Sequence, residues 1–541
     1  MNILLIDALG VGKGRRYATI DVISYGPRLI AGILEKSGFK FQLYPLRRVL
    51  FNPSIMVEFD VLMLSAMSVD LPAVRKISSL WRKFNSEGLS IIGGPIASDP
   101  YKALLKGGFQ IAVIGEGEET IEELLGLLTC KGFLEPEDLQ DIKGVAFNFS
   151  GEVKVNSLRP IMDRSKFNSY FPSIKTVKNY PNYWMRRVYV EVVRGCSNFY
   201  RTTIKLSDGR KCINCNLCRT GSLSERVKCP LSIPPGCGYC SVPSVFGPTR
   251  SRDEKKIFEE FKGLIEEGCR RFILSGSDFL DYGRDLLVEP EPLTDPRDPP
   301  PNIDAIESLL SGLKSIVNAM DEKIFIGVEN VKPSLVNEQV AKILGRYLNG
   351  SPVHIGCETG CEIHAYTLGR SSSPKEVLRA IKLLKRYGLR PYVYFIHGLP
   401  GQSLETARKT VKVMEAAEKL GVEKLTVYRF QPLPMSAFGD FPNPPPSHLD
   451  PASSLIVEKA REINSRLKFK WIGRVVEAYI VKVHVKGFSY IGYPLKHGPV
   501  IFIKGKNLLA KPSGKLHKVK IVKVISDRAV EGVFIGSIIS R

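Results

Sequence analysis

The chain has 541 residues, of which 44% are hydrophobic, and it carries a formal net charge of +22 at pH 7. This length excludes a single small domain and predicts about two to four domains. The positive charge favours a polyanionic partner, nucleic acid before a membrane surface, although a generally basic proteome can also produce it. No apolar run reaches the ~18 residues that a bilayer-spanning helix needs, and the N-terminal run is too short for a signal peptide, so we expect a cytoplasmic protein without a membrane span.

Residues 1–142 alternate apolar runs with helical patterns, which predicts a doubly wound α/β domain with a parallel sheet. We expect strands at 2–9, 40–46, 61–67, 89–95 and from 112, with helices at 21–37 and 71–86. The loop after the first strand contains Gly10, Gly12, Lys13, Gly14, Arg15 and Arg16. Its spacing is neither that of a P-loop nor GxGxxG, so we interpret it as a tight turn and a weak phosphate signal.

A connector over 143–187 leads into a region that contains seven of the eleven cysteines. These are Cys196, Cys212, Cys215, Cys218, Cys229, Cys237 and Cys240. The spacing of two residues between thiols, in a chain with no secretory leader, favours metal binding over disulfide bonds. Thiolates at this spacing can converge on one metal ion or one iron–sulfur cluster.

An apolar strand ends in RGC at Cys196, and a compact CxxC pair follows at Cys237 and Cys240. This pattern resembles the radical S-adenosylmethionine (SAM) superfamily, in which three cysteines hold a [4Fe-4S] cluster whose fourth iron binds SAM. The resemblance implies Cys196, Cys237 and Cys240 as ligands. The family normally has three residues in the first gap, whereas forty residues, 197–236, stand here. Cys229 is therefore an alternative first ligand, and we favour Cys196 because the strand would deliver it to the barrel mouth.

The insert carries four cysteines of its own, in a CxxCxxC run that is followed, after ten intervening residues, by Cys-Pro. This order is close to a ferredoxin run and predicts a closed site that transfers electrons or is structural. Cys212, Cys215, Cys218 and Cys229 would hold a second [4Fe-4S] cluster or a zinc ion. The basic residues around them fit either site, and they also fit a surface near nucleic acid.

Three later motifs stand in the order that the superfamily shows: SGSD (275–278), IGCETG followed by LGR (355–370), and GLPG (398–401). By resemblance, Asp278 is a candidate contact for the SAM amino group and Glu358 for the ribose. The SAM-site residues that the resemblance implies are Tyr239, Ser275, Gly276, Asp278, Glu358, Arg370, Gly398 and Gly401. It also implies a partial (β/α)6 barrel over 188–435, with the cysteine-rich insert at 197–236.

The first domain resembles the cobalamin-binding domain that precedes many radical SAM cores. The resemblance rests on the βα order, on the GGP at 93–95 and on the GEGE at 115–118. The usual cobalamin signature supplies a histidine from the first loop, but all seven histidines lie at position 354 or beyond. Any cobalamin would therefore lack a histidine ligand from this domain, and a degenerate scaffold that binds none is the alternative.

A linker and a helix at 436–468 precede a β-rich segment, 469–541, whose short alternating strands predict a small β-barrel. The pattern resembles the RNA-binding TRAM domain of tRNA methylthiotransferases. Basic residues exceed acidic ones by about eleven from 470 onward, with Phe488, Tyr490 and Tyr493 among them. Such a face suits phosphate contacts and base stacking, and a basic barrel that only docks onto the core is the alternative.

Three functions compete at this point. The first is a radical SAM enzyme that adds a methyl or methylthio group to an RNA base, most plausibly in tRNA, and takes electrons from a ferredoxin or flavodoxin. The second is a cobalamin-dependent radical SAM methylase or cyclase that acts on a small molecule or lipid. The third is a non-catalytic zinc protein that binds RNA.

Overall fold

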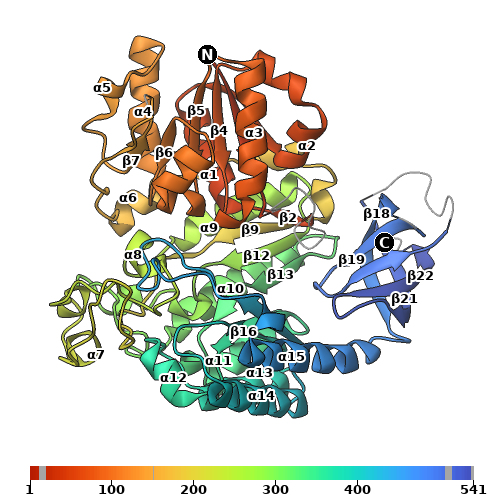
Figure 1. The fold of residues 1–541 in the computed structure, drawn as a ribbon. Coiled ribbons are helices and arrows are strands. Elements are labelled where there is room, and N and C mark those ends of the chain that lie inside the picture. The colour runs from red at the N-terminus through yellow and green to blue at the C-terminus, as the bar shows by residue number, and fades with distance from the viewer. Residues whose placement is uncertain (11–19, 150, 486, 506–513, 538–541) are drawn as a thin grey trace. The chain divides into compact units, whose positions relative to one another are not determined.

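The computed structural model describes residues 1–10, 20–149, 151–485, 487–505 and 514–537 (Figure 1). The first loop, with Gly12, Lys13, Gly14, Arg15 and Arg16, lies outside the described residues. The chain forms two compact units, Met1–Val190 with Arg252–Cys269, and Glu191–Ser251 with Arg270–Arg541. In the described part of the chain, no helix is both long enough and apolar enough to cross a membrane.

The first unit is built on a seven-stranded sheet in the order β3-β1-β4-β5-β6-β7-β8, and its first five strands are parallel. The strands are β1 (Asn2–Asp7), β3 (Lys40–Pro45), β4 (Val61–Ser65), β5 (Leu89–Gly93), β6 (Ile111–Val113), β7 (Val145–Phe147) and β8 (Lys154–Val155). The helices are α1 (Tyr25–Lys36), α2 (Leu46–Phe51), α3 (Leu71–Phe84), α4 (Glu118–Lys131), α5 (Pro136–Leu139) and α6 (Arg164–Asn168), of which α1, α3 and α4 flank the sheet in Figure 1. The predicted doubly wound parallel sheet is confirmed.

Helix α9 (Glu254–Glu266) belongs to this first unit, although the sequence analysis placed it in the central core. Its Glu260 is fully buried and pairs with Arg28 of α1 at 2.7 Å, and it also binds Arg252. A Cβ at Gly263 would lie 2.5 Å from Ile174, so glycine lets the connector pack directly on the helix. A buried carboxylate between two guanidinium groups is costly to separate, which explains why this helix stays with α1.

The second unit contains parallel pairs of strands separated by helices. Strand β12 (Arg271–Ser275) pairs with β13 (Phe325–Val328), and β14 (Asn330–Val331), β15 (Pro352–Glu358), β16 (Arg390–His397) and β17 (Lys424–Arg429) form a parallel sheet. The connecting helices are α10 (Ile303–Asn318), α11 (Glu338–Leu348), α12 (Glu362–Thr367), α13 (Pro374–Arg386) and α14 (Leu404–Lys419). Because parallel strands end at one edge of a sheet, the motifs that follow β15 and β16 lie near one another. The motif that follows β12, in another sheet, is joined to the end of β14 by the Lys332 N–H, which donates to Asp278 at 2.9 Å.

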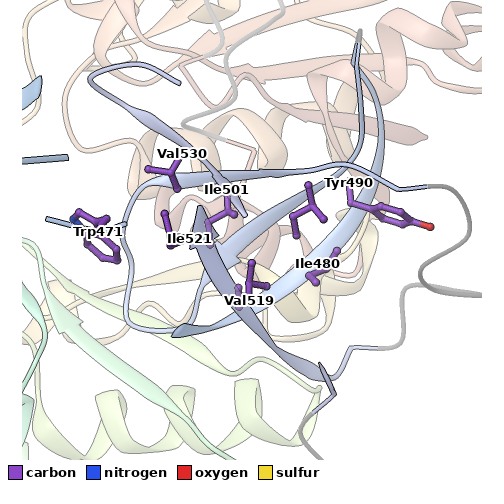
Figure 2. Packing of buried hydrophobic residues seen from close by; sticks show 9 residues of the cluster. Trp471, Ile480, Tyr490, Ile501, Val519, Ile521 and Val530 are labelled. Carbon is purple, nitrogen blue, oxygen red and sulfur yellow. The ribbon is translucent and has the colours of Figure 1, made fainter. Parts of the chain in front are cut away.

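After α15 (Pro451–Phe469), five strands close into the predicted small barrel in the order β18-β19-β20-β22-β21. They are β18 (Val475–Val485), β19 (Phe488–Pro494), β20 (Val500–Ile503), β21 (Leu516–Val524) and β22 (Ala529–Ser537). Strand β21 alternates buried Val519 and Ile521 with exposed Lys518 and Lys520, so one face fills the interior. Figure 2 shows these side chains packed with Trp471 in the barrel core.

Two of the three aromatic residues expected on the basic barrel face lie inside the protein. Tyr490 is 3% exposed and Tyr493 is 4% exposed, and Tyr490 is part of the barrel core (Figure 2). This corrects the expectation. Tyr490 points into the barrel core, whereas Tyr493, three positions further along β19, is on the opposite side of the strand and is buried outside that core. Phe488 is only partly buried, contacts Phe502 with a ring distance of 5.2 Å, and has Lys504 over its ring.

The barrel is also hydrogen-bonded to the strands of its own unit. The buried Arg271 of β12 donates to the carbonyls of Pro494 and Leu495, at 3.0 and 3.1 Å. Arg390 of β16 donates to the carbonyls of Lys496 and His497. Removal of the barrel would therefore leave two guanidinium groups without these acceptors.

Candidate functional site

Three cysteines of the second unit lie close together. Cys196 comes just after β10 (Val193–Arg194), and Cys237 and Cys240 precede α8 (Val242–Phe246). Burial raises the pKa of the Cys196 thiol to about 11, and Cys237 adds to the shift. Burial raises the pKa of Cys240 to about 12, with additions from Cys237 and Cys196. Both thiols therefore lie in buried surroundings, where deprotonation costs more than in water.

Asn198, which the sequence analysis did not single out, links the first cysteine to the pair. Its backbone N–H donates to Cys196 Sγ at 3.4 Å, and its side-chain amide donates to Cys237 Sγ at 3.3 Å. The same amide donates to the carbonyl of Gly369 at 3.0 Å, which fixes its direction. Hydrogen bonds to ligating sulfurs stabilise thiolates and tune the reduction potential of a cluster.

The glycine of the RGC run is required by its surroundings. Gly195 has φ +84°, and a Cβ on it would lie 2.2 Å from the carbonyl oxygen of Pro248. Cys196 N donates to the carbonyl of Gly247 at 3.1 Å, so this turn runs against the segment that follows the CxxC pair. A side chain at position 195 would move Cys196 away from that segment.

A buried ion network supports the loop that carries Cys196. The backbone N–H and hydroxyl of Ser197 donate to Asp281 at 3.3 and 3.0 Å. Lys332 donates to Ser197 Oγ at 2.7 Å and pairs with Asp281 at 2.5 Å and Asp278 at 3.2 Å. Burial alone would raise the pKa of Asp281, but Lys332 and Arg284 together lower it to about 2. The network therefore fixes Ser197, the residue that follows the first cysteine, through hydrogen bonds to buried charged groups.

A second cluster of polar groups joins the CxxC pair to the end of β15. Arg370 donates to the hydroxyl of Tyr239, pairs with Glu358 at 3.2 Å, and donates to the carbonyl of Gly356 at 2.8 Å. Burial raises the pKa of Glu358, which Arg370 opposes. Glu358 has φ +63°, a conformation that non-glycine residues adopt rarely and that recurs at ligand sites. Three of the expected SAM-site residues, Tyr239, Glu358 and Arg370, thus form one group.

Of the SGSD residues at the end of β12, Ser275 and Gly276 form a turn against β10, and Asp278 is part of the buried ion network. Ser275 donates to Glu329 at 2.6 Å, and a Cβ on Gly276 would lie 2.9 Å from Val193, so this turn packs against β10. Asp278 is fully buried and is held by Lys332. Of the two acidic residues, the partly exposed Glu329 is the more accessible to a ligand's amino group.

The two glycines of GLPG form a turn after β16. Both have positive φ, +74° at Gly398 and +80° at Gly401. The backbone N–H of Gly398 donates to Gln402, and a Cβ on Gly401 would meet Ile204 and His364 at 3.3 to 3.5 Å. The turn lies against the start of the insert, because Ile204 belongs to it.

The four cysteines of the insert line one small cavity of about 20 Å³, together with Arg201, Arg219, Lys228 and Tyr366. The Asn214 N–H donates to Cys212 Sγ at 3.4 Å. Arg219 lies between two aromatic rings, 4.4 Å from the centroid of Tyr200 and 4.1 Å from that of Tyr366. Cys229 therefore lies with the insert cysteines, whereas Cys196 lies with the CxxC pair, which supports Cys196 over Cys229 as the first ligand.

Both thiol groups offer the donor chemistry that iron–sulfur clusters use. Soft sulfur donors, N–H groups directed at them and nearby cations all favour an anionic iron–sulfur group. Within the ranges that the structure describes, no three His, Cys, Asp or Glu side chains converge closely enough to bind a single metal ion.

The carboxyl edge of the N-terminal sheet is the other candidate site. Asp7 ends β1 there, and burial raises its pKa to about 6, although Tyr180 donates to it at 2.7 Å and opposes the shift. A Cβ on Gly94, whose φ is +82°, would lie 2.9 Å from the carbonyl of Ala66. The first unit contains no histidine in its sequence, so a corrin bound at this edge would receive no imidazole from it.

Comparison with known proteins bears on both sites. Residues 227–414 match the model of the radical SAM superfamily, and residues 16–125 match the B12 binding domain. The uncharacterized protein MK0932 of Methanopyrus kandleri is 44% identical over 98% of this chain and 95% of its own length. The chain belongs to the radical SAM superfamily. It shares a family with MK0932 and has an N-terminal B12-binding domain.

Other radical SAM proteins resemble the chain more distantly. A tRNA-2-methylthio-N(6)-dimethylallyladenosine synthase of Sulfurihydrogenibium sp. is 24% identical over 56% of this chain and 63% of its own length. The radical SAM methyltransferase TsrM of Kitasatospora setae, solved with tryptophan and a SAM analogue, has a TM-score of 0.58 at 14% identity, over 94% of this chain and 81% of its own. Superfamily membership implies a [4Fe-4S] cluster and SAM as cofactors, and the B12-binding domain supports cobalamin as a third.

Proposed function

We propose that this radical SAM enzyme transfers a methyl or methylthio group to a base of RNA, with tRNA as the expected substrate. The observation that carries the proposal is the combination of the SAM-site cysteines and a closed β-barrel whose outer face presents Lys518 and Lys520 in one chain. Exposed lysines on a small barrel suit phosphate contacts. The cluster and SAM, when bound, supply radical chemistry at an unactivated carbon.

The residues of the second unit have distinct parts in this proposal. Cys196, Cys237 and Cys240 would hold the cluster, with Asn198 donating to two of the sulfurs. Glu358, held by Arg370 against Tyr239, would contact the ribose of SAM. The four insert cysteines would hold a second [4Fe-4S] cluster or zinc, and a ferredoxin or flavodoxin would supply electrons.

A second candidate is a cobalamin-dependent methylase or cyclase that acts on a small molecule or lipid. It is favoured by the match of residues 16–125 to the B12 binding domain and by the fold shared with a cobalamin-type methyltransferase. It needs no polyanion-binding face. A purely structural zinc protein is not proposed further, because the radical SAM domain supports an enzyme.

Incubation of the anaerobically reconstituted protein with reductant, methyl-labelled SAM and RNA from a strain that lacks this gene separates the candidates. The proposal predicts labelled nucleosides in digested RNA, detected by mass spectrometry. In the opposite result, RNA stays unlabelled while a small-molecule or lipid extract, treated in the same way, becomes labelled. That result would contradict the RNA proposal and favour the second candidate.

A further inference from the structure

The N-terminal unit contains a pocket at a place different from its candidate site at the carboxyl edge of the sheet. A pocket of about 590 Å³ lies wholly within this unit, between α3, the turn at 104–110 and the segment 148–149. Ser90 of β5 and Gln110, just before β6, place it at the amino ends of these strands. It is therefore at the edge of the sheet opposite to Asp7 and Gly94. Its volume falls within the range of about 300–1,000 Å³ that is usual for small-ligand pockets.

The charges around this pocket have one sign. Its cations are Arg75 and Arg82 of α3 and Lys106, all exposed at its walls, and none of the described residues that line it is acidic. Across the described residues, no acidic side chain pairs with Arg75, Arg82 or Lys106. Three uncompensated cations around a hollow raise the local concentration of anions.

Gly108 leaves space at the base of the pocket, and Ser78 orients the side chain of Arg82 there. Gly108 has φ +79°, and a Cβ on it would lie 2.5 Å from Ser78 Oγ and 2.9 Å from Arg82 Nη2. Ser78 Oγ donates to the carbonyl of Gly108 at 3.1 Å, and Arg82 Nη2 donates to Ser78 Oγ at 3.3 Å. Arg82 is therefore held next to the Gly108 backbone, where any residue with a Cβ would collide with its guanidinium group. A short π-helix, Lys102–Lys106, leads into this turn, and such distortions recur at functional sites.

We propose that this pocket binds the phosphate group of a nucleotide, either free or within an RNA strand. Arginine presents a planar fork that matches phosphate oxygens, and two arginines with a lysine suit one dianionic or two monoanionic phosphates. The pocket is larger than a phosphate alone needs, and the exposed ring of Phe149 on its wall can stack on a base. The site is independent of the transfer reaction proposed above, because it uses none of the residues assigned to it.

Equilibrium binding to the full-length protein tests the proposal, with a 5′-ribonucleoside monophosphate as the probe. The double variant Arg75→Gln/Arg82→Gln should bind it about tenfold more weakly, because each lost cation contact is worth up to about fivefold. The matched control is Lys76→Gln/Lys83→Gln, which removes the same charge from the same helix outside the pocket and should leave affinity unchanged. An equal loss in both variants would overturn the proposal.

Further probes separate the phosphate from the base and identify the source. The unphosphorylated nucleoside should bind at least about tenfold more weakly than the monophosphate, and equal binding would overturn the proposal. Phe149→Ala should weaken the nucleotide but not inorganic phosphate. An oligoribonucleotide that binds more tightly than the mononucleotide, and is weakened by the double variant, identifies RNA as the source. An oligoribonucleotide that binds no more tightly identifies a free nucleotide.

Discussion

The ammonium group of Lys332 donates to the hydroxyl of Ser197 at 2.7 Å, one residue beyond Cys196. The same ammonium is paired with two fully buried carboxylates, Asp278 and Asp281. The first cysteine of the site is thus supported by a charge network from strand ends that lie far away in the sequence. Loss of the cation would leave the buried Asp278 without an ion-pair partner, and Arg284 alone would then balance Asp281.

Lys332→Met is therefore expected to lower the free energy of unfolding by about 3–5 kcal/mol, the usual cost of breaking a buried ion pair from one side. Chemical denaturation of the full-length protein, followed by circular dichroism, measures it. Lys323→Met is the matched control, because Lys323 is 57% exposed and pairs with Glu477 at the surface, and it should change stability by less than about 1 kcal/mol. Equal effects in the two variants would contradict the role assigned to Lys332.

The N-terminal unit should lose stability as pH rises through the range in which Asp7 ionises. Burial raises the pKa of Asp7 in the folded state to about 6, above its value near 4 in an unfolded chain. Protonated Asp7 therefore contributes to the free energy of unfolding. This contribution is fully present below pH 4 and is lost as pH rises through 6. The loss is on the order of 3 kcal/mol.

Asp7→Asn should remove this dependence, so the variant gains thermal stability over the wild type at pH 7.5 but not at pH 4. Differential scanning calorimetry at the two pH values measures it. Asp60→Asn is the control, since its carboxylate is 62% exposed. A wild-type stability that is flat between pH 4 and 7 would show that Asp7 is ionised at little cost.

If RNA is the substrate, its affinity should depend on the lysines of the outer barrel face. Lys518→Ser/Lys520→Ser should weaken RNA binding and reduce the slope of log affinity against log salt by about 0.7 for each lost phosphate contact with a single strand. Point variants are preferable to truncation, because Arg271 and Arg390 bind barrel carbonyls. Filter binding across a salt series measures this, and an unchanged slope would remove the barrel from the RNA-binding surface.

Metal analysis should distinguish the two cysteine groups. Cys215→Ser and Cys218→Ser should lower the metal content of the insert while the SAM-binding cluster stays spectroscopically present. Anaerobic iron, sulfide and zinc determination measures this. A drop in iron and sulfide identifies a second cluster, a drop in zinc alone identifies a zinc site, and unchanged metal content would contradict any metal role for the insert.

The parts of the fold that follow local patterns could be predicted from the sequence, and those that depend on distant contacts could not. Alternating strands and helices predicted the N-terminal sheet, and period-two alternation predicted the barrel. The placement of α9 depends on Glu260 meeting Arg28 and Arg252, which lies outside any local pattern. The inward direction of Tyr490 depends on strand register, and a shift of one residue would have exposed it.

The candidate site divides in the same way. Cysteine spacing and the order of short motifs predicted the thiol groups, Glu358 and Arg370, and their ligand roles stay predictions. Asn198 and Lys332 carried no signal, because an asparagine two residues after a cysteine and a lysine after a short strand are common in any chain. Their roles arise only when β10, β12 and β14 bring the segments together.

We propose that Cys196, and not Cys229, completes the SAM-binding cluster with Cys237 and Cys240. Electron paramagnetic resonance of the reduced, reconstituted protein with and without SAM tests it most directly, since SAM bound to the open iron changes the signal of that cluster. Cys229→Ser is predicted to keep the SAM-dependent change and Cys196→Ser to lose it. A SAM-dependent change that persists in Cys196→Ser and disappears in Cys229→Ser would contradict the account.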